Sequence, residues 1–352
     1  MQLLILGGTG WLGGQIVHAA LERGHEVTCL ARAKTGALPD GAAFVKADRT
    51  QPDAYETVRT TQWDAVIDVA SQPGQVRAAA AALMDRVGTY IYVSSASVYA
   101  SHARLDEDEQ AEILPALESD VLTNISEYGR AKVACEQIVR DAFGSAGALI
   151  VRPGLIGGPG DKTDRSGYWP LRFARASQHG RDVLLPDNPK QQTQLIDVRD
   201  LAQWLVDCAS RGVSGSFNAS GAPTPFAEHI RFARAVAEHQ GPVKAAPSDW
   251  LTAQGVAPWM GPRSLPLWLP MADHAGFGAR SSAKAVQAGL RRRALQDTLR
   301  DTLAWELTRQ PLDRPRQAGL SDADENELLQ ALAASKASPR EQDGTPAGNS
   351  GD

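Results

Sequence analysis

A run of glycines near the start of the chain constrains its fold more than any other feature. Gly7, Gly10 and Gly13 follow the short apolar run Leu3 to Leu6 and precede apolar residues at helical spacing from Trp11 to Leu21. A strand, a tight glycine turn and a helix in this order typically open a parallel α/β sheet. Because the helix N-terminus offers free N–H groups and partial positive charge, the turn is predicted to bind phosphate.

The same stretch, from Gln2 to Leu21, carries no charge and is long enough to span a bilayer. Its glycines, and the lack of a positive region before it, favour the turn over a membrane span or signal peptide. The formal net charge of −5 argues against sequence-independent binding to nucleic acid. Three separated cysteines predict a reducing compartment, and the histidines form no metal-ligand cluster. We therefore expect a cytoplasmic protein with no membrane, nucleic-acid or metal partner.

Short apolar runs alternate with helical patterns over the first half of the chain. After the first run they fall at Val27–Leu30, Phe44–Val45, Asp64–Ala70, Tyr90–Ser94 and Ala148–Val151. Helical patterns lie between them, notably at Gln75–Arg86 and Tyr128–Phe143. Nearly continuous apolar strands that alternate with helices predict an α/β fold with a doubly wound parallel sheet of the Rossmann type.

The pattern changes after about Pro153, which suggests a second unit. We predict a nucleotide-binding domain over 1–165 plus 195–220, and a small discontinuous C-terminal substrate-binding lobe over 166–194 plus 221–310. A C-terminal extension with a short helix is expected over 311–334. Residues 335–352 contain no Val, Ile, Leu or aromatic residue, so this tail is expected to be disordered.

The end of the second predicted strand bears on the choice of dinucleotide. An acidic residue there would bind the ribose 2′-hydroxyl of NAD, whereas Arg32 suits the 2′-phosphate of NADP. The alternative is that Arg32 and Lys34 are solvated loop charges. Asp48, which ends the third predicted strand, is expected to contact the adenine. NADP is thus the preferred cofactor and NAD the alternative.

A tyrosine and a lysine lie four residues apart, at Tyr128 and Lys132, and so share one face of a helix. A neighbouring ammonium favours the phenolate form of a phenol, which makes the pair suitable for acid/base chemistry. Such pairs are common by chance. Here, however, Ser94, Ser95 and Ser97 lie upstream, at a strand end that faces the ligand crevice of a parallel sheet.

Together these residues resemble the extended short-chain dehydrogenase/reductase superfamily, and more narrowly the NAD-dependent epimerase/dehydratase family with its atypical reductase-like branch. The resemblance rests on the glycine turn, Asp48, the strand-end serines and Tyr128-x-x-x-Lys132. It also rests on four segments: DAVID at 64–68, SSASVYA at 94–100, EYGRAKVACEQIV at 127–139 and LIDVRDLA at 195–202. It covers about 1–220 well, 221–310 more loosely, and the tail not at all.

The resemblance implies a role for individual positions. Ser95 is expected to be the catalytic hydroxyl, Tyr128 the proton donor or acceptor, and Lys132 the residue that binds the nicotinamide ribose. Residues Arg152 to Leu155 are expected beside the nicotinamide carboxamide, and a homodimer is the expected assembly. The expected cofactor-binding set is Gly7, Thr9, Gly10, Trp11, Leu12, Gly13, Arg32, Asp48, Arg49, Ala70, Ser94, Lys132, Pro153, Gly154 and Leu155.

Two departures from the family pattern narrow the chemistry. Sugar 4,6-dehydratases carry an acidic pair directly after the catalytic hydroxyl, where this chain has Ala96 and Ser97. Nucleotide-sugar epimerases usually place an Asn after the sixth strand, where this chain has Leu155. With Arg32, these departures favour an NADPH-using reductase of a small-molecule carbonyl. The alternatives are a nucleotide-sugar epimerase with retained NAD, and a non-catalytic NAD(P)- or RNA-binding relative.

Candidate substrate contacts are Ser97, Asp161, Trp169 and Trp259. The two tryptophans would wall an aromatic or apolar pocket, although aromatics in irregular segments more often pack into a local core. Asp161, Asp164 and Arg165 belong to the segment GDKTDR, which borders the crevice in this fold. They either contact substrate or are solvated loop charges.

Overall fold

The computed structural model describes residues 1–32, 38–269, 271–309 and 315–337. Lys34 and residues 338–352 of the predicted tail lie outside these ranges. Within them, no helix is long and apolar enough to cross a membrane.

A sheet of seven parallel strands forms the centre of the larger domain, in the order β11-β6-β5-β4-β1-β2-β3. The chain therefore winds outward from β1 in both directions, which confirms the predicted doubly wound fold. The strands are β1 (Gln2–Leu6), β2 (Glu26–Ala31), β3 (Ala43–Lys46), β4 (Trp63–Asp68), β5 (Val87–Val93), β6 (Ala148–Pro153) and β11 (Gly215–Ala219). Only β11 has no counterpart among the predicted strands.

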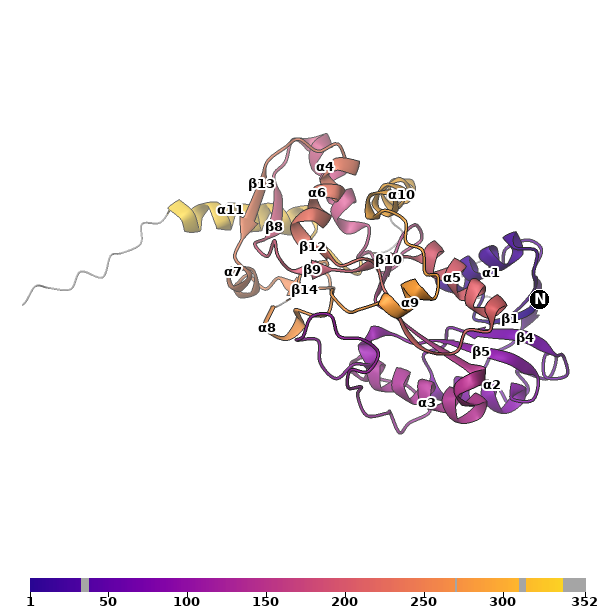
Figure 1. Cartoon of the computed structure of the whole chain (residues 1–352). Helices are drawn as coiled ribbons and strands as arrows, with labels where there is room; N and C mark the ends of the chain where they lie inside the picture. The colour runs from indigo at the N-terminus through magenta and orange to yellow at the C-terminus, as the bar shows by residue number, and fades with distance from the viewer. Residues whose placement is uncertain (33–37, 270, 310–314, 338–352) are drawn as a thin grey trace, which may run out of the picture.

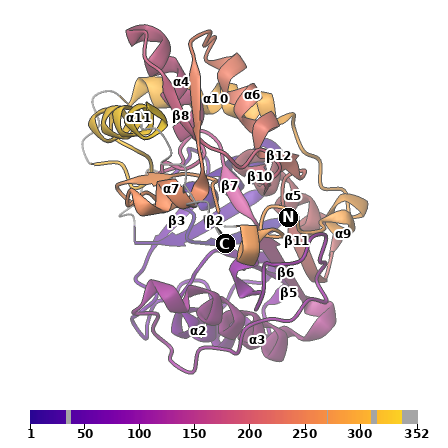
Figure 2. The same cartoon turned by 90° about the vertical axis from the view of Figure 1, so that its left-hand side faces the viewer.

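Helices cover both faces of this sheet (Figures 1 and 2). One face packs against α1 (Trp11–Glu22) and α5 (Val198–Arg211), and the other against α2 (Pro73–Leu83) and α3 (Tyr128–Gly147). In β1, Leu3 and Ile5 join the first core while Leu4 and Leu6 join the second. Successive strand side chains point to opposite faces, so strands buried on both faces are continuously apolar.

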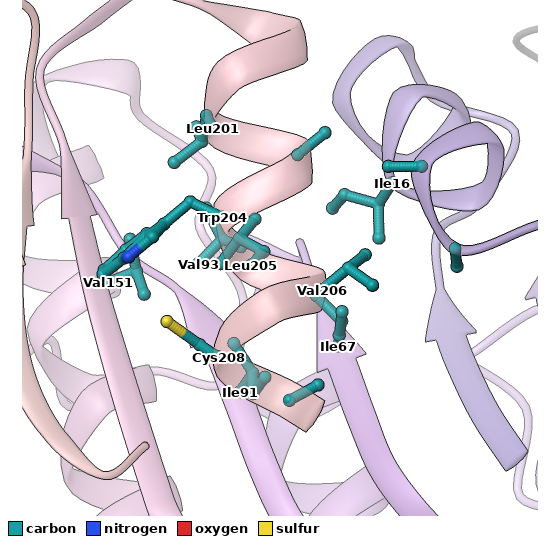
Figure 3. Close-up of a cluster of buried hydrophobic side chains, with 14 of the residues drawn as sticks. Ile16, Ile67, Ile91, Val93, Val151, Leu201, Trp204, Leu205, Val206 and Cys208 are labelled. Carbon is teal, nitrogen blue, oxygen red and sulfur yellow. The ribbon is translucent and has the colours of Figure 1, made fainter. Parts of the chain in front are cut away.

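Helix α5 anchors the first of these cores (Figure 3). It begins where the Asp197 carboxylate accepts the backbone N–H of Arg199, and it ends at Gly212 in the left-handed conformation. Its Trp204 lies beside Val151 of the sheet and donates its indole N–H to the carbonyl of Ala288. Burial of each such large apolar side chain contributes about 1.5–3 kcal/mol.

The second unit is a lobe with its own core. Its main elements are α4 (Tyr168–His179), α6 (Phe226–Val236), α10 (Leu295–Thr308) and the parallel pair β8 (Val183–Pro186) and β13 (Val243–Ala246). The smaller elements of the two units together are two 3₁₀ turns (Ala96–Val98 and Ile125–Glu127), β7 (Leu155–Gly157), β9 (Gln192–Thr193), β10 (Leu195–Asp197), β12 (Thr224–Pro225), α7 (Ser248–Ala253), β14 (Ala257–Pro258), β15 (Ser264–Leu265), α8 (Met271–His274) and α9 (Ala283–Gln287).

The domain boundaries differ from the predicted ones in three places. Helix α9 was assigned to the lobe, but Ala285 and Leu290 pack into the core of the sheet domain. The extension over 311–334 is not separate, because α11 (Asp322–Ala337) places Leu328 and Leu332 in the core of the lobe. The same helix continues through residues 335–337, which were assigned to the disordered tail.

Candidate active site

Two adjoining clefts lie where the strands of the sheet end. The smaller, about 320 Å³, is lined by residues that follow β1, β2 and β4, and the larger, about 740 Å³, by residues that follow β5 and β6. Both clefts include Gly10 and Val69, so they form one continuous path. This path crosses the point between β1 and β4 where the strand order reverses, which is where doubly wound sheets bind their ligands.

The glycine turn fits the pyrophosphate of a dinucleotide. Gly7 has a φ of 98°, a conformation that side chains rarely adopt. A Cβ at Gly13 would lie 2.2 Å from the carbonyl oxygen of Gly7, so α1 can start this close to the turn only with glycine at position 13. No acidic residue occupies the first turn of α1, whose free N–H groups are therefore suited to an anion.

The smaller cleft would hold the adenosine end. It is lined by Gly7, Thr9, Gly10, Arg32, Arg49 and Ala70 of the expected cofactor set. Asp48 does not line it, although its neighbours Ala47 and Arg49 do. The carboxylate of Asp48 instead accepts the backbone N–H and the hydroxyl of Thr50, which fixes the loop after β3.

Arg49 is held in a buried network and is less available to the cofactor than expected. Its guanidinium donates to both carboxylate oxygens of Asp68 at 2.7 Å, to the Tyr55 hydroxyl at 2.7 Å and to the carbonyl of Gln75 at 3.0 Å. Burial alone would raise the pKa of the Asp68 carboxyl, but Arg49 holds it below its usual range. The pair thus ties the loop after β3 to β4.

The predicted catalytic residues Ser95, Tyr128 and Lys132 all line the larger cleft. Lys132 donates to the carbonyl oxygens of Ala70 at 2.8 Å and Val93 at 2.7 Å, so its ammonium is fixed between the ends of β4 and β5. It lies 5.9 Å from the centre of the Tyr128 ring. The hydroxyl of Ser95 donates to that of Ser97 and accepts the backbone N–H of Ser97, both at 3.1 Å.

A close backbone approach brings Tyr128 to these serines. Gly129, the second residue of α3, lies directly against the turn at 96–98, and a Cβ there would lie 2.1 Å from the carbonyl oxygen of Ser97. Only glycine permits this contact. The position of Tyr128 relative to Ser95 therefore depends on the residue that follows the tyrosine.

Two residues expected at the cofactor are bonded to Glu136 of α3. Ser94 lines the larger cleft as expected, but its hydroxyl donates to Glu136 at 2.6 Å, so its proton is directed to the helix. Arg152 pairs with the same carboxylate through two donors, at 2.9 and 2.7 Å, whereas Pro153, Gly154 and Leu155 do line the cleft. Burial would raise the pKa of Glu136, but these partners hold it below its usual range.

The larger cleft also has an apolar wall, to which residues of both units contribute. It consists of Leu114, Ile125, Trp259, Met260 and Phe277, so of the two tryptophans proposed for the pocket only Trp259 lines it. Trp169 is fully buried in the core of the lobe, where its indole N–H donates to the carbonyl of Pro266. The predicted pocket role of Trp169 was wrong, because α4 turns the face that carries this side chain toward α6.

Asp161 was also expected to meet substrate, but it is fully buried and does not line the cleft. Its carboxylate accepts the N–H and hydroxyl of Thr163 and of Ser166, so it shapes the loop from inside. The sequence signal for this role was the Asp-x-Thr spacing of an Asx turn. Met260 and Phe277 were missed because nothing in their sequence context places them at the cleft.

Comparison with known proteins gives the family. A model of the NAD dependent epimerase/dehydratase family matches residues 3–219. The chain belongs to this family. Its membership confirms the resemblance and supports an NAD(P)-dependent enzyme.

Individual relatives differ in what they do. 2′-Dehydrokanamycin reductase of Streptomyces kanamyceticus is 32% identical over 270 residues, 72% of each chain. Chloroplast stem-loop binding protein of 41 kDa b of Arabidopsis thaliana is 27% identical over 242 residues, 62% of this chain and 58% of that one. The solved structure of UDP-N-acetylglucosamine 4-epimerase from Bacillus cereus matches with a TM-score of 0.63 at 18% identity, over 90% of this chain and 99% of that one. This last likeness shows a shared fold.

Proposed function

We propose that this member of the family is an NADPH-using reductase that converts a small-molecule carbonyl to an alcohol. The observation that carries the proposal is the meeting of Ser95, Tyr128 and Lys132 in one cleft, next to the glycine turn. The similarity to 2′-dehydrokanamycin reductase supports it.

When bound along the glycine turn, a reduced nicotinamide supplies a hydride to the carbonyl carbon. Ser95 and Tyr128 donate hydrogen bonds to the carbonyl oxygen as negative charge develops on it. Tyr128 then gives its hydroxyl proton to this oxygen, so the carbonyl becomes an alcohol. The ammonium of Lys132 stabilises the phenolate that remains until solvent returns the proton.

The smaller cleft supports NADP over NAD. Arg32 is exposed at the end of β2 and lines this cleft, and none of the described residues that line it is acidic. A guanidinium suits a 2′-phosphate, whereas recognition of an unmodified ribose usually uses a carboxylate. NAD remains the alternative cofactor.

The epimerase alternative has less support from the site. Leu155 lines the larger cleft at the end of β6, and its aliphatic side chain cannot donate a hydrogen bond to a substrate diphosphate. An epimerase would also keep its cofactor bound through the whole reaction cycle. A non-catalytic role, suggested by the stem-loop binding relative, leaves the Ser–Tyr–Lys arrangement without a use.

The test is a cofactor titration followed by NADPH oxidation against a panel of ketones and aldehydes, for the wild type and Tyr128→Phe. We expect NADPH to bind and to be consumed, with turnover lowered roughly 10²–10⁴-fold in the variant. If NAD co-purifies and is never released, the epimerase alternative is favoured. If NADPH binds without any turnover, the non-catalytic alternative is favoured.

We further propose a cytoplasmic setting and a homodimer. The thiols of Cys29, Cys135 and Cys208 are free and buried, which is compatible with a reducing compartment. A single monomeric species at micromolar concentration in sedimentation analysis would refute the dimer.

A further inference from the structure

The larger cleft contains a cation that the proposed proton transfer does not use. Arg165 lines the cleft together with Ser95 and Tyr128, on the side of the apolar wall. Among the described residues that line this cleft there is no aspartate or glutamate. The substrate end of the site therefore presents positive charge with no acidic residue in its lining.

The contacts of Arg165 leave most of its guanidinium available. Its Nε donates to the hydroxyl of Thr163 at 3.0 Å, and the guanidinium carbon lies 5.0 Å from the centre of the Trp259 ring. Among the contacts of the described residues, Arg165 forms no ion pair with a carboxylate, and its Nε–Thr163 bond is its one hydrogen bond. By contrast, the arginines Arg49 and Arg152 each have a buried carboxylate partner at 2.7 Å.

Burial makes an unpaired guanidinium costly. Desolvation lowers the pKa of Arg165 from its ordinary value, although Asp161 and Tyr128 act in the opposite direction. A partly buried charge without a counter-ion is stabilised when an anion binds beside it. An anionic ligand would thus supply the partner that the protein does not.

The loop holds Arg165 in place from both sides. The Asp161 carboxylate fixes Thr163 and Ser166, as described above. Asp164 has a φ of 62°, a strained value for a residue other than glycine, and its carboxylate accepts from Arg309 at 2.9 Å and from the N–H of Gln317 at 2.8 Å. Backbone strain that the surroundings maintain is frequent at ligand sites.

We propose that Arg165 binds a carboxylate of the substrate, so that the substrate is an oxo acid with an apolar body. The guanidinium fork would accept the carboxylate through two parallel hydrogen bonds. The apolar wall of Leu114, Ile125, Trp259, Met260 and Phe277 would cover the remainder. This inference rests on the proposed reductase function.

The experiment compares aryl-substituted oxo acids with their methyl esters, over a series in which the spacing between ketone and carboxylate varies. Turnover with NADPH is measured for the wild type, Arg165→Met and Arg165→Lys, and binding of the same compounds with NADP⁺ present is measured by calorimetry. We expect the wild type to prefer at least one acid over its ester. Arg165→Met should raise KM and Kd for that acid roughly 10–100-fold, as loss of a charged hydrogen bond implies, and leave the ester nearly unchanged. Arg165→Lys should recover part of the loss.

The outcomes separate this inference from the reductase proposal. If acids bind in an Arg165-dependent way but nothing is reduced, the carboxylate site stands and the reductase proposal fails. If ketones are reduced with equal preference for acids and esters, the carboxylate site fails and the reductase stands. Failure of every acid to bind also overturns the inference. Weaker binding of NADPH itself to Arg165→Met would assign Arg165 to the cofactor and overturn it too.

Discussion

Replacement of Gly129 by alanine tests whether the start of α3 sets the catalytic geometry. The added Cβ would lie 2.1 Å from the Ser97 carbonyl oxygen, whereas real contacts of this kind are essentially never shorter than 3.0 Å. Helix α3 and the turn at 96–98 must therefore move apart by about 0.9 Å. Because the atom that the Cβ would meet is a backbone oxygen, no side-chain rotation can relieve the contact. Because a misplacement of about 1 Å can cost roughly 10²-fold in rate, we expect turnover to fall by about that factor.

The assay is NADPH oxidation with the best ketone of the panel, together with NADPH affinity by fluorescence titration. Affinity should change little, because Gly129 does not line the smaller cleft, which would hold the adenosine end. Gly147→Ala is the matched control in the same helix, since its Cβ would meet Phe143 at 3.4 Å, an ordinary contact. If Gly129→Ala keeps the turnover of Gly147→Ala, this backbone approach does not position Tyr128. An equal loss of NADPH affinity would show a general disturbance of the cleft instead.

Three further predictions concern the cofactor and stability. Arg32→Ser should weaken NADPH binding more than NADH binding in titrations, and equal effects would remove Arg32 from cofactor selection. Trp204→Ala should lower the free energy of unfolding by about 3–5 kcal/mol in urea denaturation, because it empties part of a buried core, whereas Val286→Ala on the exposed surface should change it by less than about 0.5 kcal/mol. The depressed pKa of Asp68 means that its contribution to stability is present above its unfolded pKa of about 3.9 and is lost as pH falls through the folded value. Asp68→Asn should therefore be several kcal/mol less stable at pH 7, with a difference that narrows below about pH 4, and a pH-independent difference would contradict this.

Much of the sheet domain could be predicted because its patterns are local. Apolar runs such as Leu3–Leu6 are buried on both faces, and the glycine turn has a single structural use next to a strand and a helix. Strand β11 was not predicted because GSFNA shows no apolar run, and its pairing with β6 is a long-range property. Helix α9 was assigned to the wrong unit for a similar reason, since sequence order does not show which core it joins.

The site could be predicted in part. Motif spacing correctly indicated that Ser95, Tyr128 and Lys132 would share a cleft, although their catalytic roles stay predictions. It could not show that the Ser94 hydroxyl is directed to Glu136, because partners of buried polar groups come from distant segments. The sequence allowed two interpretations of Arg165, a substrate contact or a solvated loop charge. Only its place in the cleft and the arrangement of its neighbours favour the first.

Isotope transfer from NADPH tests the central claim most directly. NADPH deuterated at the transferable position is incubated with the enzyme and a ketone that it reduces, and the product is analysed by mass spectrometry. The account predicts one deuterium on the carbinol carbon of the alcohol, one oxidised coenzyme released per alcohol formed, and near-complete loss of both in Tyr128→Phe. A product without deuterium, or label that stays on a coenzyme never released, would contradict it.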